Sequence, residues 1–397
     1  MENIKYDHIV VRYGELSLKG KNIKDFKRKL VDNIKSRLCD FKTLEYKTLH
    51  DGLFIKLNDE KYDVVAEALK DVFGYSFFSG CFIIEKDLDK VKELALNIAK
   101  KKDYKTFKIV TKRIDKSFSL RSDEINRNVA GYILSNHNIK VDVHNPELYI
   151  YIYVQNDSIL VMDNKEKGLG GFPVGINGSA LVMMSGGIDS PVAAFKTMQR
   201  GLRVECIHFA SQPYTSVQAL NKVKDLVKII SKHQGTIRLH VIPFTDLQLA
   251  IYDTAGDPYA VTLMRRMMYR IADKIAQKNN IKVITNGESV GQVASQTPES
   301  ISVISNVCDT LILRPLCMED KIDIVNYAKK IKTYETSILP YEDCCTIFDP
   351  KNPVTKPKEK QCLFFESKFD YNKLVDDCVN KEECILITYR EKKEDIF

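Results

Sequence analysis

The sequence contains no apolar stretch long enough to cross a membrane, and its first residues, Met1 to Asp7, are charged rather than hydrophobic. A membrane-spanning helix needs about 20 largely apolar residues, and an export signal needs a shorter apolar run near the N-terminus. These two absences predict a cytoplasmic protein that is not bound to a membrane. With 397 residues, of which 44% are hydrophobic and 28% charged, the chain is expected to form about two to four globular domains.

The ten cysteines lack the CxxC spacing from which thiolate metal sites are typically built. We therefore expect no metal centre or iron–sulfur cluster, including at Cys308, Cys317 and Cys362. Cysteines without a regular pattern are typical of reduced thiols in the cytoplasm. The net charge of +7 is compatible with nucleic-acid binding but does not require it.

One short segment carries a clear chemical signal. Ser185–Ser190, with the sequence SGGIDS, follows the apolar run 180–184 and precedes a helical pattern that begins at Pro191. Backbone N–H groups at Gly186 and Gly187 can approach an anion closely, the helix N-terminus adds positive partial charge, and serine hydroxyls offer further donors. The loop lacks the lysine and the longer spacing of GxxxxGK[ST], so it is not that class of nucleotide loop. It predicts a phosphate ligand.

The first half of the chain is expected to form two small α+β modules, 1–60 and 61–165. Periodicity predicts a strand, a helix and two strands in the first module, at 8–13, 23–38, 41–48 and 53–57. In the second it predicts helices 61–72, 87–101 and 122–135, strands 76–86 and 106–111, and a hairpin of 148–154 with 159–162. The alternating tyrosines of that hairpin, Tyr149, Tyr151 and Tyr153, suit either base stacking or ordinary strand packing.

A glycine-rich linker, 166–178, precedes a region of alternating strands and helices, 179–397. This alternation predicts a doubly wound parallel sheet whose ligands bind beyond the carboxyl ends of the strands. The expected strands are 202–209, 236–243, 282–285 and 310–314, and the expected helices are 216–233, 259–279 and 319–331. Each of the candidate side chains near these strand ends also has an ordinary structural role. The pair Arg265 and Arg266, for example, suits a solvated helix face as well as a phosphate clamp.

Several motifs occur together in one order along the chain. The SGGIDS loop resembles the pyrophosphate loop (PP-loop) of ATP pyrophosphatases, and it is accompanied by GELSLKGKN, LMRRMMYRIA, TNGESVGQVASQT and LPYEDCCTIFDP. With these motifs the chain resembles the tRNA 4-thiouridine synthase family, also called tRNA sulfurtransferases. The resemblance implies an α/β multidomain protein. Its parts are an N-terminal ferredoxin-like domain (1–60), a THUMP domain that recognises the tRNA acceptor end (61–165) and, after the linker, a PP-loop adenylating domain (179–397).

The resemblance implies that ATP activates the uridine at position eight of tRNA and that persulfide sulfur replaces its C4 oxygen, giving 4-thiouridine. It also implies a cysteine desulfurase or a sulfur-carrier protein as donor, allows a homodimer, and leaves open a second role in thiamine thiazole synthesis. Some family members carry a C-terminal rhodanese domain with the persulfide cysteine. The 52 residues 346–397 are too few for a typical domain of about 100 residues, so we expect a short form without it.

Site residues are carried over by motif position. Asp189, the carboxylate of the loop, is expected to bind Mg²⁺ or organise the adenylation site, although a short acidic side chain there also suits capping of the following helix. Cys345 is favoured over Cys344 as the sulfur-handling residue, because it immediately precedes Thr346. The residues expected to contact ATP are Met183, Met184, Ser185, Gly186, Gly187, Asp189, Ser190, His208, Phe209, Arg265, Gly287 and Gln296.

Three alternatives remain open from the sequence. A tRNA 2-thiouridine enzyme would share the loop and the chemistry but lack the THUMP-like half. A PP-loop amidating ligase would use ammonia and would not need about 170 residues of RNA-binding module. A non-enzymatic RNA-binding protein would leave the SGGIDS loop unexplained.

Overall fold

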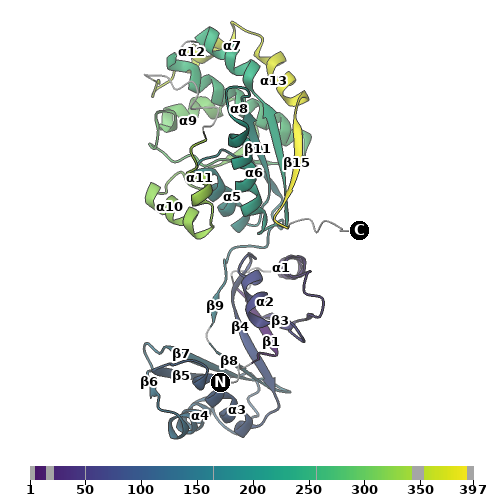
Figure 1. Ribbon diagram of the computed structural model, residues 1–397, viewed down its shortest axis with the longest axis vertical. Coiled ribbons are helices and arrows are strands. Elements are labelled where there is room, and N and C mark those ends of the chain that lie inside the picture. The colour runs from purple at the N-terminus through teal and green to yellow at the C-terminus, as the bar shows by residue number, and fades with distance from the viewer. Residues whose placement is uncertain are drawn as a thin grey trace. The chain divides into compact units, whose positions relative to one another are not determined.

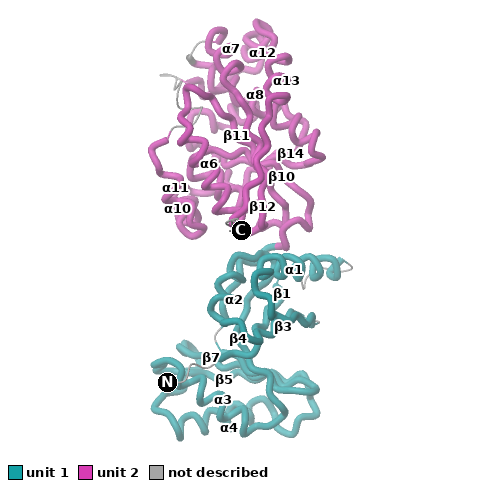
Figure 2. The backbone as a smooth tube through the Cα atoms, turned by 45° about the vertical axis from the view of Figure 1, so that its right-hand side comes forward, with its two compact units in different colours: residues 1–171 teal, residues 172–397 magenta. Residues whose placement is uncertain are grey.

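The computed structural model describes residues 5–14, 22–49, 51–163, 165–255, 257–341 and 353–390. The chain divides into two compact units, Met1–Gly171 and Phe172–Phe397 (Figure 2). Positive φ angles at Gly170 and Gly171, 67° and 68°, let the backbone turn at this boundary, where other residues would be strained. No helix among the described residues is both long and apolar enough to span a bilayer.

Unit 1 is built on one sheet with helices packed against it (Figure 1). The strands run in the order β2-β3-β1-β4-β8-β7-β5-β6, and β9 pairs with β4. The elements are β1 (His8–Tyr13), α1 (Ile23–Arg37), β2 (Glu45–Thr48), β3 (Gly52–Lys56), α2 (Tyr62–Leu69), β4 (Tyr75–Ile84), α3 (Leu88–Lys100), β5 (Thr106–Arg113), α4 (Ser122–Asn136), β6 (Lys140–Val141), β7 (Leu148–Val154), β8 (Ile159–Met162) and β9 (Glu166–Lys167).

The ten-residue strand β4 belongs to both halves of this sheet. Its residues from Tyr75 to Cys81 pair with β1, and those from Cys81 to Ile84 pair with β8. The predicted hairpin is confirmed, because β7 pairs antiparallel with β8 from Tyr151 to Val154. Burial alternates strictly along β7, so that its aliphatic side chains enter the core while its tyrosines are half-buried on the other face.

Unit 2 contains a six-stranded sheet in the order β14-β13-β10-β11-β12-β15. Its elements are β10 (Ser179–Met183), α5 (Asp189–Gln199), β11 (Arg203–Ala210), α6 (Val217–Ser231), β12 (Thr236–Pro243), α7 (Thr245–Ala255), α8 (Asp257–Lys278), β13 (Val283–Thr285), a short 3₁₀ turn (Ala294–Gln296), α9 (Pro298–Ser305), β14 (Leu311–Leu313), α10 (Lys321–Lys330), α11 (Tyr334–Ser337), α12 (Glu359–Glu366), α13 (Tyr371–Asn380) and β15 (Glu383–Thr388). All neighbouring strands are parallel except β12 and β15.

The sheet of unit 2 differs from the predicted parallel sheet in its edge strand β15, which is antiparallel to its neighbour β12. It pairs with β12 from Thr236 opposite Thr388 to Val241 opposite Glu383, and its side chains are mostly exposed or half-buried, so its hydrophobic pattern is weak. A buried contact holds it in place. The His240 ring on β12 bonds Glu205 from Nε2 at 2.9 Å and Glu382, the residue before β15, from Nδ1.

The core of unit 2 is organised around α8. Arg266 on this helix is 1% exposed, and its Nε donates to Glu366 Oε1 of α12 at 2.7 Å. Arg270 donates to the same carboxylate at 2.8 Å. The two arginines hold the pKa of Glu366 below its usual range although burial opposes this. The pair Arg265 and Arg266 is therefore not the solvated helix face that its sequence also allowed.

Candidate functional site

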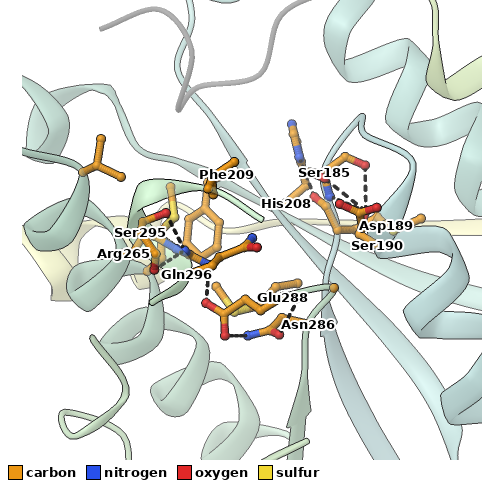
Figure 3. A pocket seen from close by; sticks show the side chains of 16 residues that line it. Ser185, Asp189, Ser190, His208, Phe209, Arg265, Asn286, Glu288, Ser295 and Gln296 are labelled. Atoms are coloured by element: carbon orange, nitrogen blue, oxygen red, sulfur yellow. Dashed lines mark hydrogen bonds and ion pairs between the residues drawn. The ribbon is translucent and has the colours of Figure 1, made fainter. Parts of the chain in front are cut away.

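A cavity of about 430 Å³ opens at the carboxyl ends of β10, β11 and β13 (Figure 3). This is the edge of a doubly wound sheet where ligands bind, because the loops that follow neighbouring strands converge there. The cavity is lined by Met183, Met184, Ser185, Asp189, Ser190, His208, Phe209, Val261, Arg265, Met268, Asn286, Gly287, Glu288, Val293, Ser295 and Gln296.

Most of the residues expected to contact ATP lie around this one cavity. Figure 3 shows Ser185, Asp189 and Ser190 on one side of it and Arg265 and Gln296 on the other, with Phe209 between the two sides. Gly186 and Gly187 belong to the same loop but are not part of the lining. Cys344 and Cys345 lie outside the described residues. The contacts of all these residues with a ligand stay predictions.

The loop is braced by its own serine hydroxyls. Ser185 N donates to Ser190 Oγ at 3.0 Å, Ser190 Oγ donates to Ser185 O at 3.1 Å, and Gly187 N donates to Ser185 Oγ at 3.3 Å. Ser190 is only 4% exposed. The sequence suggested these hydroxyls as donors to an anion, whereas here they hold the loop's shape. The first turn of α5, with its positive partial charge, borders the cavity directly.

Gly287 lies against this first turn and has no room for a side chain. A Cβ atom placed on it would be 2.8 Å from the carbonyl carbon of Asp189, 2.9 Å from Asp189 Cβ and 3.0 Å from Ser190 N. Real Cβ atoms essentially never come so close to backbone atoms. The exit of β13 therefore touches the start of α5, and only glycine permits this contact.

Asp189 is the first residue of α5, and its carboxylate is bound from two sides. Oδ1 accepts from Lys321 Nζ at 2.5 Å, and Oδ2 accepts from Gln292 Nε2 at 2.8 Å. Ile188 is the N-cap residue of this helix, and no side chain caps it. The alternative role of Asp189 as a helix cap is therefore wrong. Sequence reasoning missed Lys321 and Gln292, because neither belongs to the loop and only the fold brings them to it.

A buried network supports the opposite side of the cavity. Glu288 is 2% exposed and forms ion pairs with Arg265 and with Arg314, whose Nε lies 2.6 Å from Glu288 Oε2. Burial opposes ionisation, but the two guanidinium groups hold the pKa of Glu288 below its usual range. Arg265 also donates to Ser295 Oγ at 2.9 Å, so its orientation is determined from two sides. Glu288 belongs to the TNGESVGQVASQT motif but was given no role from the sequence, and Arg314 belongs to none of the motifs.

The remaining lining is largely apolar. Met183, Met184, Phe209, Val261 and Met268 contribute to it, and Phe209 packs edge-on against Phe244 at 5.4 Å between ring centres. An apolar wall with a few oriented polar groups is typical of small-molecule sites. Within the described residues, no group of three or more His, Cys, Asp or Glu side chains is arranged to hold a metal ion by itself.

Three family models match successive parts of the chain. The model described as thiamine biosynthesis protein (ThiI) matches residues 175–371, the ThiI ferredoxin-like domain matches 8–79, and the THUMP domain matches 85–162. A Brevibacillus brevis protein named "Probable tRNA sulfurtransferase" is 44% identical over 393 residues, 98% of each chain. The chain belongs to the ThiI family. The family and the architecture predicted from the sequence are thereby confirmed.

Solved structures agree with this assignment. A 4-thiouridine synthetase in complex with RNA and ATP matches with a TM-score of 0.89 and 34% identity, over 96% of this chain and all of that one. PH1313 from Pyrococcus horikoshii, with 23% identity and a TM-score of 0.63 over 82% of this chain and 99% of that one, shows the same fold. The ferredoxin-like match extends beyond residue 60 to residue 79, so it takes in α2 and the first half of β4, which complete a βαββαβ unit.

We expect the substitution Gly287→Ala to weaken binding of inorganic pyrophosphate at least ~10-fold, about 1.4 kcal/mol, because the added Cβ displaces the first turn of α5. Isothermal titration calorimetry on the full chain measures this. Gly131→Ala is a matched control, since a Cβ at Gly131 meets nothing within 4 Å. Equal affinity in Gly287→Ala and the wild type would show that the contact does not shape the anion site.

Proposed function

We propose that this protein uses ATP to adenylate the uridine at position eight of tRNA and then replaces the C4 oxygen with sulfur, giving 4-thiouridine. The family assignment supports a tRNA sulfurtransferase. The observation that carries the proposal is the cavity in which the SGGIDS loop, an apolar wall and the oriented Arg265 meet. A cytoplasmic location, a homodimer and sulfur transfer for thiamine thiazole synthesis are further proposals taken from the family resemblance.

ATP fits the two-sided character of this cavity. Its triphosphate would lie at the loop and the N-terminus of α5, where backbone donors and the helix dipole favour anions. The adenine would lie along the apolar wall that Phe209 and Met268 contribute to. Arg265 and Gln296 lie on the side away from the loop, so they would contact the base or ribose end (Figure 3). This differs from the arginine contact to phosphates that the sequence suggested.

Adenylation makes the C4 oxygen of uracil replaceable. This oxygen is a poor leaving group, but after it attacks the α-phosphate of ATP and pyrophosphate departs, it can leave as part of AMP. Positive charge held in place near the phosphates stabilises the negative charge that develops on the phosphate oxygens in this step. The N-terminus of α5 supplies such charge, and so does Lys321, whose Nζ is 2.5 Å from Asp189 Oδ1 at the same end of the cavity.

Asp189 suits a magnesium ligand. Mg²⁺ is usually held by one or two carboxylates together with substrate phosphates, and Asp189 lines the cavity beside the phosphate loop. Glu288, the other acidic residue of the lining, is already neutralised by Arg265 and Arg314. Asp189 would therefore hold the ion, which would offset the charge of the triphosphate. Lys321 would then be free to exchange the carboxylate for a phosphate oxygen.

The variant Asp189→Asn should lose at least ~100-fold in AMP formation from ATP and unmodified tRNA. A neutral amide lacks the negative charge with which the carboxylate would hold Mg²⁺. Its tRNA affinity should stay within about 2-fold, since the RNA-binding residues proposed below lie in unit 1. AMP is followed by thin-layer chromatography and tRNA binding by filter retention. Asp246→Asn, at an exposed carboxylate 3.5 Å from Lys381, is the control. Wild-type AMP formation in Asp189→Asn would remove this residue from catalysis.

Unit 1 offers a basic and aromatic cavity of about 350 Å³. It is lined by Arg12, Tyr13, Ile23, Lys27, Asp51, Phe77, Lys112, Tyr153 and Lys165. Lys165 Nζ lies 3.6 Å from the ring centre of Tyr151 and 4.7 Å from that of Phe77, and burial lowers its pKa. Cations interleaved with aromatic rings suit the phosphates and unstacked bases of a single-stranded end. We propose that this cavity binds the tRNA acceptor end.

Lys112→Gln and Lys165→Gln, each in the full chain, should weaken tRNA binding. Each should also reduce the slope of log affinity against log salt by about 0.7–0.9, because one phosphate contact releases about that many counterions. Filter binding at several salt concentrations gives the slope. Lys90→Gln, at a lysine on α3 that pairs with Glu85 at 2.7 Å, is the control. If both cavity variants keep the wild-type slope, tRNA does not bind in this cavity.

Sulfur delivery requires a thiol and an electron source. A desulfurase or carrier persulfide would pass its terminal sulfur to the Cys345 thiol, which leaves a thiol on the donor. That sulfur attacks C4 of the adenylated uridine and AMP leaves, so C4 is joined to Cys345 through an S–S bond. Two thiol–disulfide exchanges with a thiol reductant then leave the sulfur on C4, restore Cys345 and oxidise the reductant to its disulfide.

We expect Cys345→Ser to lose 4-thiouridine formation when a cysteine desulfurase with cysteine is the donor, but not when sulfide is supplied in excess. Sulfide can attack the adenylate directly, without a persulfide. Cys344→Ser should be milder, and both variants should still form AMP. The measurement is nucleoside analysis of initially unmodified tRNA, with Cys384→Ser, at an exposed cysteine, as the control.

The same assay tests the whole proposal. Full desulfurase-supported activity in Cys345→Ser would move the role to Cys344 or to a separate carrier protein. Formation of 2-thiouridine, or of no thionucleoside with either donor, would contradict the proposed reaction itself.

A further inference from the structure

Gln292 holds the carboxylate of Asp189, and the proposed chemistry has not used it. Its Nε2 donates to Asp189 Oδ2 at 2.8 Å, across 103 positions of the sequence. Gln292 belongs to the loop between β13 and the 3₁₀ turn Ala294–Gln296, and it is not part of the cavity lining. The described contact of this side chain with the cavity is therefore made through Asp189.

The oxygen of the same amide is left without a partner. Gln292 Oε1 is buried, and nothing among the described residues donates a hydrogen bond to it. An unpaired buried acceptor costs about 1–3 kcal/mol, so it calls for an explanation. The nitrogen must face Asp189, because an oxygen there would meet a negative charge. The remaining oxygen would suit a water ligand of an ion held at Asp189, since Mg²⁺ usually keeps several waters.

Backbone hydrogen bonds fix the loop from which Gln292 extends. Gly291 N donates to Gln296 O at 2.9 Å and closes a turn around Gln292, and Val290 N donates to Cys317 O at 3.1 Å. Gly291 has a φ of 80°, which is favourable for glycine and strained for other residues. The amide of Gln292 is therefore presented from a fixed backbone, as a residue that orients another side chain requires.

The two partners of Asp189 differ in what they do when a cation binds. Lys321 carries a positive charge that competes with Mg²⁺ for the carboxylate, and its side chain is 46% exposed, so it can move away. The amide of Gln292 is neutral and has no such conflict. Gln292 is therefore the partner that keeps hold of Oδ2 while Oδ1 becomes available to the ion.

We propose that Gln292 is a positioning residue for Mg²⁺: its amide holds Asp189 Oδ2 and so orients the carboxylate that binds the ion. The proposal rests on the proposed function, in which Asp189 holds Mg²⁺ beside the triphosphate. Gln292 itself is assigned no contact with ATP or with the uridine. Groups that orient metal ligands in this way typically contribute about 10–100-fold to metal affinity.

The test measures binding of α,β-methylene ATP by isothermal titration calorimetry, with excess Mg²⁺ and with EDTA. The methylene bridge prevents release of pyrophosphate, so that binding is measured without reaction. The proteins compared, each as the full chain, are the wild type, Gln292→Met, Asp189→Asn and the double variant. Methionine keeps the length of the side chain but lacks the amide. Gln277→Met is the control, because the Gln277 amide donates to Asp273 Oδ2 at 3.0 Å on α8.

With Mg²⁺, Gln292→Met should bind the analogue at least ~10-fold more weakly than the wild type, whereas with EDTA the two should agree within about 2-fold. In the Asp189→Asn background, Gln292→Met should change the affinity with Mg²⁺ by less than about 2-fold, because the carboxylate that Gln292 orients is gone. A purely structural loss would be equal with Mg²⁺ and with EDTA, and equal in both backgrounds. Such a loss, or no loss with Mg²⁺, overturns the proposal. If Gln292→Met does not fold, Gln292→Ala takes its place under the same criteria.

The Asp189→Asn variant separates this inference from the proposed function. If it binds the analogue with Mg²⁺ as tightly as the wild type does, Asp189 holds no ion, and the role of Gln292 is wrong with it. If Asp189→Asn loses the gain in affinity that Mg²⁺ brings but Gln292→Met keeps it, only the positioning role is overturned. Adenylation is read separately, from AMP formation, so its failure is not confused with either result.

Discussion

The contact between Gly287 and the first turn of α5 sets the geometry of the cavity. A Cβ atom added to Gly287, which follows β13, would lie within 3.0 Å of backbone atoms of Asp189 and Ser190 at the start of α5. The next residue, Glu288, lies in the cavity lining, where it forms ion pairs with Arg265 and Arg314. One close backbone approach thus connects the SGGIDS loop on one side of the cavity with the oriented arginine on the other.

Adjacent arginines on α8 serve different parts of unit 2. Successive helical residues point about 100° apart, so Arg265 reaches Glu288 beside the cavity while Arg266 reaches Glu366 of α12. Each carboxylate is buried and is bound by two arginines. Loss of one partner from such a pair typically costs about 3–5 kcal/mol, whereas the intact pair adds little net stability. These networks therefore act mainly by determining orientation.

Local patterns predicted the elements that form from contiguous sequence. The bounds of β1 and β12 agree with the predicted strands 8–13 and 236–243, and the loop lies between a strand and a helix as expected. Contacts between distant residues could not be predicted in this way. Lys321 meets Asp189 across 132 positions, and β15 carries too few buried side chains to produce a strand pattern of its own.

The ten-residue strand β4 has a mechanical consequence for unit 1. Because it pairs with β1 along one part and with β8 along the other, any bend between the two modules would have to break backbone hydrogen bonds within a single sheet. The ferredoxin-like and THUMP modules therefore form one stiff platform rather than two jointed pieces. Side chains from β1, β4, β5 and β7 around the basic cavity keep their spacing on that platform, so an RNA end would meet a rigid template instead of shaping its own binding site.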